Sequence, residues 1–531
     1  MAERPALSGR PGRIDPSRVV TMAPFTQADT EGVRVRTVIV LAAGMGKRMK
    51  SDLPKVLHPV LGRTLVGHVL ATVGEAFGGD ARTVVVVGNG AERVTSHVAE
   101  IAPEAVVALQ AEQRGTGHAV RIALESAKVT EGRVIVLNGD IPMLTAETLR
   151  ALERLHDEGD GAAATMLTAE VDDPTGLGRI VRTVDGGVAK IVEHRDATPE
   201  ELAIREINAG AYAFDGMLLQ ETLAKVSTHN DQGEEYLTDV VALLVDSGRP
   251  VRAYRTADAD ETLGCNDRVE LAALRARLRD RVNEGWMRSG VSIIDPATTW
   301  IDVTARVEPD AVIEPNTHLR GSTTVGAGAV VGPDTSLIDT DVAARATVLR
   351  THAQGASVGE GASVGPYAYL RPGTALGTKA KVGTFVETKN AQLGEGAKVP
   401  HLSYIGDATV GEHSNVGAAT VTVNYDGVAK HRTVIGAHAR TGADNMFVAP
   451  VEVGDGAYTA AGSVITNDVP PGALGVARGK QRNIDGWVAR RRPGTAAADA
   501  AARASGGPVD DEGAASGDVR GDRAGEEAGG R

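Results

Sequence analysis

A glycine-rich turn near the start of the sequence holds the first residues that could do chemistry. The segment from Leu41 to Met49 reads Leu-Ala-Ala-Gly-Met-Gly-Lys-Arg-Met, and Leu53-Pro-Lys55 follows it. Backbone N–H groups at such a turn, helped by nearby cations, can hold phosphate groups. The glycine spacing departs from both the P-loop pattern and the dinucleotide-binding fingerprint. The turn alone therefore predicts either a phosphate site or a plain connection between a strand and a helix.

Two polar residues further along the chain could also do chemistry. Asp140 follows the apolar run Val134–Leu137, and a carboxylate at the end of a strand can bind Mg²⁺ or simply cap a turn. His401 lies in the segment Val399–Gly406, and an imidazole can take a proton from an amine as the amine attacks a thioester. A lone histidine also fits an ordinary surface or core position. Both residues need the context of the elements around them.

The first half of the chain predicts an α/β sheet that would position the turn and Asp140. Short apolar runs over 36–41, 83–87 and 134–137 alternate with stretches of helical period such as Val66–Phe77. Branched apolar runs that end in Gly or Asn-Gly-Asp favour strands buried on both faces, so we predict a Rossmann-like, mostly parallel sheet. The segment from Thr262 to Trp286 is rich in Leu, Ala, Arg and Glu and predicts a long linking helix.

Beyond residue 300 the apolar period changes to six. The first uninterrupted set is Val307, Ile313, Leu319, Val325, Val331 and Leu337. The same spacing returns from Val358 to Val382 and again from Leu393 to Ile405, often followed by glycine. Six-residue repeats predict a β-helix in which three hexapeptides form one coil of 18 residues, so roughly 170 residues would give about nine coils. His401 would then lie on this prism.

Composition narrows the classes of protein to which the chain can belong. The 531 residues carry a net charge of −13, which argues against broad binding to nucleic acid or to anionic membranes. Glycine is frequent, at 64 residues, while aromatic residues make up 3%, as the narrow interior of a β-helix requires. Cys265, the single cysteine, cannot form an internal disulfide, and no long apolar run is present. We expect a cytoplasmic protein without membrane insertion.

The motifs taken together carry a family resemblance. The string from Leu41 to Lys55 resembles the signature of sugar-nucleotide pyrophosphorylases. With Gln110–Gly117, Asn138-Gly-Asp140 and the hexapeptide repeats, residues 36–490 resemble the bifunctional N-acetylglucosamine-1-phosphate uridyltransferases and glucosamine-1-phosphate N-acetyltransferases. The resemblance implies a nucleotidyltransferase domain followed by a left-handed parallel β-helix, and a homotrimer with acetyltransferase sites between neighbouring prisms. The general rule that crossovers between parallel strands are right-handed would give the wrong handedness for such a β-helix.

For the first half, the resemblance implies a site for UTP, the sugar phosphate and Mg²⁺. Residues implied in binding UTP or UDP-N-acetylglucosamine are Leu41, Ala42, Ala43, Gly44, Arg48, Lys55, Gln110, Gly115, Thr116, Gly178, Glu193, Asn208 and Asn266. Asp140 and Asn266 are the implied Mg²⁺ ligands, which would leave coordination places for phosphates and water. Without the family, Gly178, Glu193 and Asn208 look like ordinary turn and surface residues.

For the second half, the resemblance implies an acetyl-CoA-dependent site with His401 as the catalytic base. The implied contacts of the sugar phosphate are Arg371, Lys389, Tyr404 and Asn415. The implied contacts of acetyl-CoA are Ala418, Asn424, Tyr425, Ala443, Ala461 and Arg478. The chain departs from the family at Ala443, where Ser is usual, and at Ala419, where Gly is usual. A lost hydroxyl contact would weaken acetyl-CoA binding by about 1 kcal/mol.

We expect five segments along the chain. These are a disordered tail over 1–33, a uridyltransferase domain over 34–262, a linker helix over 263–290, an acetyltransferase domain over 291–490 and a disordered tail over 491–531. Neither tail shows an apolar pattern that could form a core.

The expected function is a two-step synthesis of UDP-N-acetylglucosamine. Acetyl-CoA would acetylate glucosamine-1-phosphate, and UTP would then give its uridyl group to the product, with no nucleic-acid partner. Two alternatives stay open, namely a pyrophosphorylase for another sugar whose β-helix only assembles or regulates, and a catalytically silent scaffold that resembles translation-factor subunits. The presence of Lys55, Asp140 and Asn266 disfavours a silent protein, and His401 with the cations Arg371 and Lys389 disfavours a purely structural β-helix.

Overall fold

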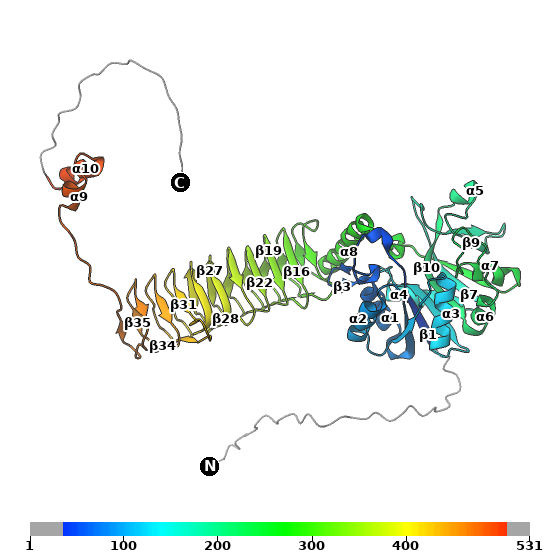
Figure 1. Ribbon diagram of the computed structural model, residues 1–531, viewed down its shortest axis with the longest axis horizontal. Helices are drawn as coiled ribbons and strands as arrows, with labels where there is room; N and C mark the ends of the chain where they lie inside the picture. The colour runs from blue at the N-terminus through cyan, green and yellow to red at the C-terminus, as the bar shows by residue number, and fades with distance from the viewer. Residues whose placement is uncertain (1–35, 507–531) are drawn as a thin grey trace, which may run out of the picture.

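The computed structural model describes residues 36–506, which form an α/β domain and a long β-prism joined by one helix (Figure 1). The expected tail over 1–33 lies outside the described residues, as does the part of the second tail beyond residue 506. No helix within 36–506 combines the length and apolar character needed to cross a membrane.

The α/β domain is built on a sheet whose central strand, β1 (Arg36–Ala42), leads into the glycine-rich turn. The strand order is β11-β7-β10-β6-β1-β4-β5, and β10 runs antiparallel to both of its neighbours. The bounds are β4 Ala81–Val87, β5 Val106–Leu109, β6 Arg133–Asn138, β7 Ala164–Glu170, β10 Glu206–Asp215 and β11 Val251–Arg255. A hairpin of β8 (Arg179–Arg182) and β9 (Val188–Val192) extends the sheet beside β10. The predicted mostly parallel sheet is confirmed.

Helices cover both faces of this sheet, as the doubly apolar strands require. Along β1, Val38 and Val40 pack on one face while Ile39 packs on the other. The first face is covered by α1 (Leu65–Phe77), α2 (Ala91–Ile101) and α4 (Ala146–Asp157). The second is covered by α3 (Thr116–Ser126), α6 (Gly216–Leu223) and α7 (Asp239–Asp246). The predicted helix over 66–77 is therefore confirmed as α1.

The linking helix α8 runs over Arg268–Arg288, so it begins later than the predicted residue Thr262. The reason is the cap, because the Asp267 carboxylate accepts hydrogen bonds from the N–H groups of Val269 and Glu270. Residues 259–262 form a short 3-10 turn instead.

Helix α8 packs against both halves of the molecule. Its residues Leu271, Leu274 and Leu278 share one buried cluster with Met49 and Leu61 of the α/β domain. Trp300 and Val303 of the first β-prism coil pack on the same cluster. The tight turn between β2 (Pro59–Val60) and β3 (Arg63–Thr64) also reaches the prism, since the Leu61 carbonyl accepts a 3.0 Å bond from the Val303 N–H. The two halves are thus joined by packing as well as by the chain.

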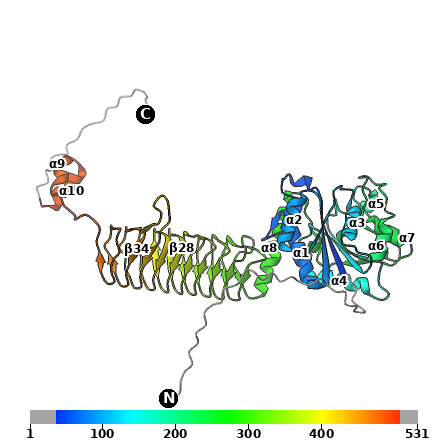
Figure 2. The same cartoon turned by 60° about the horizontal axis from the view of Figure 1, so that its bottom comes forward.

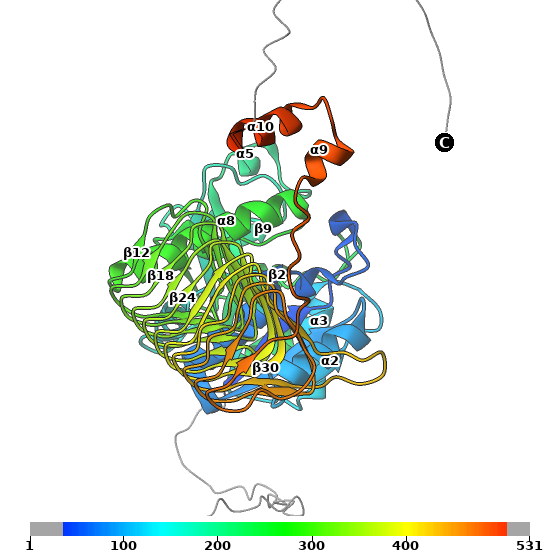
Figure 3. The ribbon, with the colours of Figure 1, turned by 90° about the vertical axis from the view of Figure 1, so that its left-hand side faces the viewer.

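The second half is a left-handed parallel β-helix of very short strands, seen in side view in Figure 2 and along its length in Figure 3. One row of strands is β12 (Ser292–Ile293), β15 (Val312–Ile313), β18 (Val330–Val331), β21 (Thr347–Val348), β24 (Ser363–Val364), β27 (Lys381–Thr384) and β29 (Lys398–His401). A second row is β13 (Trp300–Ile301), β16 (Thr317–Arg320), β19 (Thr335–Ile338), β22 (Thr351–Gln354), β25 (Ala368–Leu370), β28 (Glu387–Leu393), β30 (Tyr404–Val410), β31 (Val421–Val423), β33 (Met446–Val448) and β36 (Val464–Ile465). The third row is β14 (Arg306–Val307), β17 (Thr324–Val325), β20 (Asp341–Val342), β23 (Ser357–Val358), β26 (Ala375–Leu376), β32 (Thr433–Ile435) and β34 (Val451–Val453), with the long β28 and β30 reaching into it.

The predicted six-residue period is confirmed in the core, where Ile313, Leu319 and Leu337 are completely buried. The coil is not constant in length, however. Val312 pairs with Val330, which lies one full coil of 18 residues later, whereas Val348 pairs with Val364, which lies only 16 residues later. A coil can lose residues at its corners because the buried residue of each short strand still points inward.

An insertion interrupts the later coils at residues 424–432, between β31 and β32. In a regular coil, a residue pairs with the residue about 18 positions further along the chain, as Thr433 does with Val451. Ala408 instead pairs with Thr433, which lies 25 positions further along. The extra residues project from the side of the prism as a loop (Figure 2).

The segment expected as a disordered tail from residue 491 contains helical structure. Helix α9 spans Trp487–Arg491 and α10 spans Ala496–Ala504, beyond the last coil of the prism (Figure 1). The expectation considered apolar burial only, whereas alanine has the highest helix propensity and the Thr495 hydroxyl caps α10 by accepting from the Ala498 N–H. Neither helix buries a residue.

Candidate functional site

A cavity of about 390 Å³ lies at the carboxyl ends of β1, β5 and β6. It brings together nine of the residues predicted for nucleotide and metal binding, which are Leu41, Ala43, Gly44, Lys55, Gln110, Gly115, Thr116, Asp140 and Asn266. The start of α3 at Thr116 adds the positive end of a helix to this cavity. The arrangement suits a ligand that carries phosphates.

Backbone groups line much of the cavity, and amide side chains hold them in place. The buried Gln110 donates a 3.0 Å hydrogen bond to the Gly115 carbonyl. Gln113, which sequence reasoning missed, donates a 2.9 Å bond to the Ala43 carbonyl and so joins the glycine-rich turn to the segment before α3. Flat aromatic or amide ligands can be recognised by such fixed N–H and C=O groups.

The backbone conformation and close packing at position 115 require glycine. Its φ is +109°, and a Cβ there would lie 2.4 Å from the Glu235 carbonyl oxygen. The Glu235 carboxylate, also missed by sequence reasoning, is buried and accepts from the guanidinium groups of Arg114 and Arg121. Its carbonyl accepts a 2.8 Å bond from the Gly117 N–H. Glu235 thereby fixes the turn from which α3 begins.

The predicted metal ligands meet at one cation. The Lys55 ammonium lies 2.5 Å from an Asp140 carboxylate oxygen and 3.4 Å from the Asn266 side-chain oxygen. Two hard oxygen ligands therefore point to a single place where a positive charge already fits, and this donor set suits Mg²⁺. Because these two side chains supply only two oxygens, phosphates and water would complete the coordination shell of such an ion.

Gly178, which precedes β8, Glu193, which follows β9, and Asn208 in β10 form a separate group. The Gly178 carbonyl accepts a 2.9 Å bond from the Asn208 N–H, and a Cβ on Gly178 would lie 3.6 Å from a Glu193 carboxylate oxygen. Burial raises the pKa of Glu193, while a hydrogen bond from Thr238 opposes that shift. The three residues do meet, as the sugar-binding prediction requires.

Two predicted nucleotide residues are placed differently. The Ala42 side chain is buried in the core of the sheet, and the Arg48 side chain is exposed on the short turn Lys47–Met49. Neither lines the cavity.

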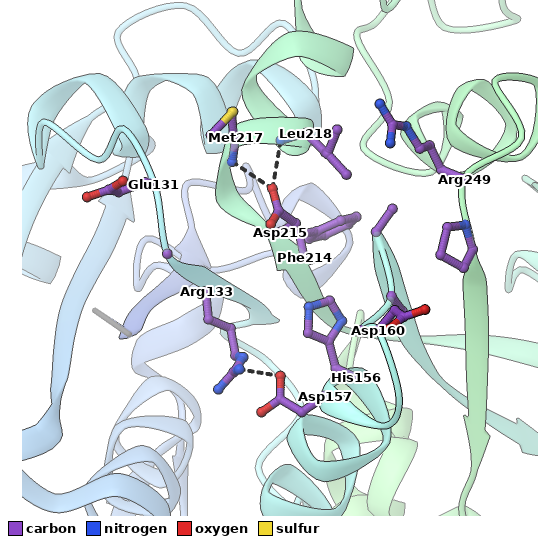
Figure 4. Close-up of a pocket in the computed structure, with 15 residues that line it drawn as sticks. Glu131, Arg133, His156, Asp157, Asp160, Phe214, Asp215, Met217, Leu218 and Arg249 are labelled. Carbon is purple, nitrogen blue, oxygen red and sulfur yellow. Dashed lines mark hydrogen bonds and ion pairs between the residues drawn. The ribbon is translucent and has the colours of Figure 1, made fainter. Parts of the chain in front are cut away.

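A larger cavity, of about 780 Å³, opens at the opposite edge of the sheet, at the amino ends of β6, β7 and β11 (Figure 4). Arg133 and His156 point into it, and Arg133 is paired with Asp157. None of the predicted site residues lines this cavity, so size alone does not identify the functional site.

The second candidate site lies on three successive coils of the prism. Arg371 follows β25, Lys389 lies in β28, and Tyr404 begins β30. Glu387, which was not predicted, pairs in register with Tyr404 and accepts a 2.9 Å bond from the Arg371 guanidinium. Parallel stacking thus places cationic and phenolic side chains side by side although they are far apart in the chain.

Asp407 lies at the centre of this site and was also missed. The residue is 8% exposed, and its carboxylate accepts from the Lys389 ammonium at 3.1 Å, from Asn390 at 2.8 Å and from Asn424 at 2.5 Å. Burial works against its charge, yet these three hydrogen bonds outweigh burial and lower the pKa of Asp407. The Asn424 amide also lies 3.5 Å from the Tyr404 hydroxyl.

The inserted loop brings a second lysine to the same place. Hydrogen bonding with the Lys430 amine and with Asp407 raises the pKa of Lys389. The Lys389 ammonium in turn lowers the pKa of Lys430. Lys389 therefore keeps its positive charge, as a phosphate ligand should.

His401 stands at one corner of the prism, at the exposed end of β29, and Tyr404 begins the next strand around the corner. Backbone hydrogen bonds continue this corner from coil to coil. The His401 carbonyl accepts from Ala419, the Ala418 carbonyl from Asp444, and the Ala443 carbonyl from Gly462 next to Ala461. The predicted small residues Ala418, Ala443 and Ala461 therefore follow one another along the corner that starts at His401.

Three predicted residues lie apart from that arrangement. Asn415 bridges Lys398 and Arg440 in the row of strands that contains β29, and lines a different cavity with them. Tyr425 is exposed on the inserted loop, where its hydroxyl donates to the Gly427 carbonyl, and Arg478 is exposed beyond the last strand. A single chain does not bring Asn415 together with Arg371, Lys389 and Tyr404.

Comparisons with known proteins point to one family. Residues 38–278 match the family model of the MobA-like NTP transferase domain. A protein of Streptomyces avermitilis named bifunctional protein GlmU is 60% identical over 475 residues, covering 89% of this chain and 98% of its own length. The proteins of that name from Streptomyces coelicolor, 60% identical over 471 residues, and Corynebacterium glutamicum, 53% over 468, cover 88% and 87% of this chain and 97% and 96% of their own.

Proposed function

The chain belongs to the family of bifunctional GlmU proteins, and from this premise we propose which of its residues carry the two reactions. One reaction transfers the acetyl group of acetyl-CoA to glucosamine-1-phosphate. The other transfers the uridyl group of UTP to N-acetylglucosamine-1-phosphate and releases pyrophosphate, so that the product is UDP-N-acetylglucosamine. The observation that carries the assignment of the first site is the convergence of nine predicted residues on one cavity.

Uridyl transfer needs alignment and charge more than covalent help from the protein. A phosphate oxygen of the sugar phosphate attacks the α-phosphorus of UTP, and the bond to the pyrophosphate oxygen breaks. We assign the uridine to the backbone groups of Leu41, Ala43, Gly44 and Gly115, with Gln110 and Gln113 fixing those groups. The Lys55 ammonium offsets negative charge on the phosphates. The group formed by Gly178, Glu193 and Asn208 binds the sugar hydroxyls and acetamido group.

We assign Mg²⁺ to Asp140 and Asn266. Their oxygens already converge on the Lys55 ammonium, which supports a cation at that place. When bound, the ion would neutralise charge on the triphosphate and on the departing pyrophosphate. Lys55 would then pair with phosphate oxygens instead of with Asp140.

Acetyl transfer needs a neutral amine and a nearby base. We assign this role to His401, which takes a proton from the amine of glucosamine-1-phosphate as the nitrogen attacks the thioester carbonyl. The carbon–sulfur bond then breaks, and the coenzyme A thiolate leaves and takes up a proton. Arg371 and Lys389 hold the phosphate, and the track of Ala418, Ala443 and Ala461 takes the coenzyme arm.

A homotrimer would complete this second site. Asn415 lies on a different row of strands from Arg371, Lys389 and Tyr404, so within one chain it cannot reach the same ligand. We propose that Asn415 of a neighbouring prism faces the ligand. Sedimentation of the purified chain should give three times the monomer mass of 55.0 kDa. A monomer that acetylates at full rate would contradict this assembly.

A single assay tests the proposed function. The purified chain is supplied with glucosamine-1-phosphate, acetyl-CoA, UTP and Mg²⁺, and UDP-N-acetylglucosamine is measured by chromatography. We expect the product only when all four are present, and expect N-acetylglucosamine-1-phosphate to replace the first two. Formation of another UDP-sugar from another sugar phosphate at a greater rate would favour the alternative pyrophosphorylase.

A further inference from the structure

Asp407 is the most connected charged group of the second site, yet its position in the sequence gives no hint of a role. Its carboxylate is buried, whereas most other aspartates of the prism are exposed. Asp334, for example, also has positive φ, and its half-exposed carboxylate accepts from the Asn316 amide and the Arg350 guanidinium, with no lysine among these partners. A buried carboxylate costs free energy unless it is paired, so its retention calls for an explanation.

We propose that Asp407 is a positioning residue of the acetyltransferase site, which holds the Lys389 ammonium and the Asn424 amide in place for the sugar phosphate and for acetyl-CoA. This inference rests on the proposed function of that site. One Asp407 oxygen lies 3.1 Å from the Lys389 ammonium and 2.5 Å from the Asn424 amide nitrogen. The other oxygen accepts a 2.8 Å bond from Asn390. A single carboxylate therefore joins a residue of one coil to the first residue of the inserted loop.

The geometry explains why the carboxylate is needed. Lys389 lies beside Lys430 of the inserted loop, and without a negative charge next to them the two ammonium groups would repel each other more strongly. Asp407 lies beside both, so it keeps the loop closed on the site while Lys389 stays charged. The loop carries Asn424, one of the predicted acetyl-CoA contacts, as its first residue. The Asp407 carboxylate, which is nearly buried and negatively charged, would repel a substrate phosphate and so acts through the residues it holds.

The test compares Asp407→Asn with the matched variant Asp334→Asn. Both aspartates have φ near +50°, a conformation that asparagine adopts as readily as aspartate, so neither change strains the backbone. We expect Asp407→Asn to raise the KM for glucosamine-1-phosphate roughly tenfold, since an ionic hydrogen bond to Lys389 becomes a neutral one. Asp334→Asn should leave that KM unchanged. Uridyl transfer from UTP, measured on the same samples, should be unchanged in both.

A pH profile separates positioning from a general loss of structure. The groups that face Lys389 are Asp407, Lys430 and Tyr404, with the ion pair of Arg371 and Glu387 on the neighbouring coil. Removing the Asp407 charge lowers the pKa of Lys389, so the KM of Asp407→Asn should rise further between pH 7.5 and 9 while that of the wild type stays flatter. A profile parallel to the wild type would overturn the proposal.

A double-mutant cycle with Lys389→Met gives the decisive result. If Asp407 acts through Lys389, adding Asp407→Asn to Lys389→Met should raise the KM by less than twofold further. A full additional tenfold increase, or a wild-type KM in Asp407→Asn alone, would overturn the proposal. If Asp407→Asn does not fold, Asp407→Gly, which tolerates the same φ, replaces it in the cycle. A wild-type chain that fails to acetylate glucosamine-1-phosphate would instead contradict the proposed function.

Discussion

At the scale of single residues, His401 decides whether the β-helix is an enzyme or a support. Its imidazole is exposed at a corner, so replacing it removes little buried surface. A positioned base contributes a factor of about 10² to 10⁴. We therefore expect His401→Ala to lose acetyl transfer by at least about a hundredfold, measured as thiol release from acetyl-CoA across pH 6 to 9.

His352 provides the matched variant for that experiment, because it is also an exposed histidine of the prism. It lies two coils away from Glu387 of the proposed site, in the same row of strands. His352→Ala should acetylate like the wild type, and both variants should keep uridyl transfer and their oligomeric state. Wild-type acetylation by His401→Ala at every pH would show that another group is the base.

Asp140 offers the corresponding test in the other half. Asp140→Asn removes one charge from the site where Lys55 and Asn266 converge, and a hard cation such as Mg²⁺ binds weakly to amide oxygens alone. We expect Mg²⁺-dependent uridyl transfer to disappear while acetyl transfer continues. The exposed Asp185 lies in the turn between β8 and β9, and Asp185→Asn should change neither activity. Equal loss of both activities in Asp140→Asn would indicate a folding defect instead.

The sequence could predict those residues that lie in local motifs, and missed those that act through long-range contacts. Lys55 and Asp140 stand in recognisable strings, and the structure brings them to 2.5 Å. Glu235 and Asp407 hold other residues from more than a dozen positions away, and nothing in their neighbours marks them. The sequence also did not predict the face of the prism on which Asn415 lies. A six-residue period predicts which residues are buried, but it does not predict which residues of different coils share a corner.

At the scale of elements, the apolar periodicity predicted which strands and helices exist better than it predicted the residues at which they begin and end. The apolar runs that became β1, β4 and β6 are buried on both faces, so no other element would satisfy them. The start of α8 was set by the Asp267 cap, a signal that helical composition alone conceals. Coil length escaped prediction because strands of two residues tolerate corners of different length.

Helix α8 leads to a prediction about the separate halves. A chain that ends at Arg288 retains all nine cavity residues, and so should keep uridyl transfer. It loses the packing of Trp300 and Val303 on the cluster around Leu274. We therefore expect a melting temperature several degrees below that of the same domain in the full chain, because a few kcal/mol of apolar burial is removed. Calorimetry measures it.

Loss of uridyl transfer in that shortened chain, while it remains folded, would show that the prism completes the first site. The structure gives no such contribution, because the prism touches the α/β domain at α8 and at the turn around Leu61. An unchanged melting temperature would show that the shared cluster adds little.

At the scale of the whole molecule, the chain ends should be dispensable for chemistry. Removing 1–33 and 496–531 takes away α10, which buries no residue, and leaves every predicted site residue in place. We expect both steady-state rates to stay within about threefold of the full chain, a barrier change of about 0.65 kcal/mol. A larger fall in one rate, with the other unchanged, would assign that end of the chain to the affected site.

The stacking of coils has a consequence for the path of the intermediate. From Trp300, beside α8, to Tyr404 the pairing passes through His318, Ser336, His352, Tyr369 and Glu387. Six steps of about 4.8 Å separate the proposed acetyltransferase site from the α/β domain by about 30 Å. A molecule of N-acetylglucosamine-1-phosphate must therefore enter bulk water before it meets UTP. Isotope-labelled glucosamine-1-phosphate should give UDP-sugar whose label is diluted in proportion to any unlabelled intermediate added, and undiluted label would reveal a hidden route along the prism.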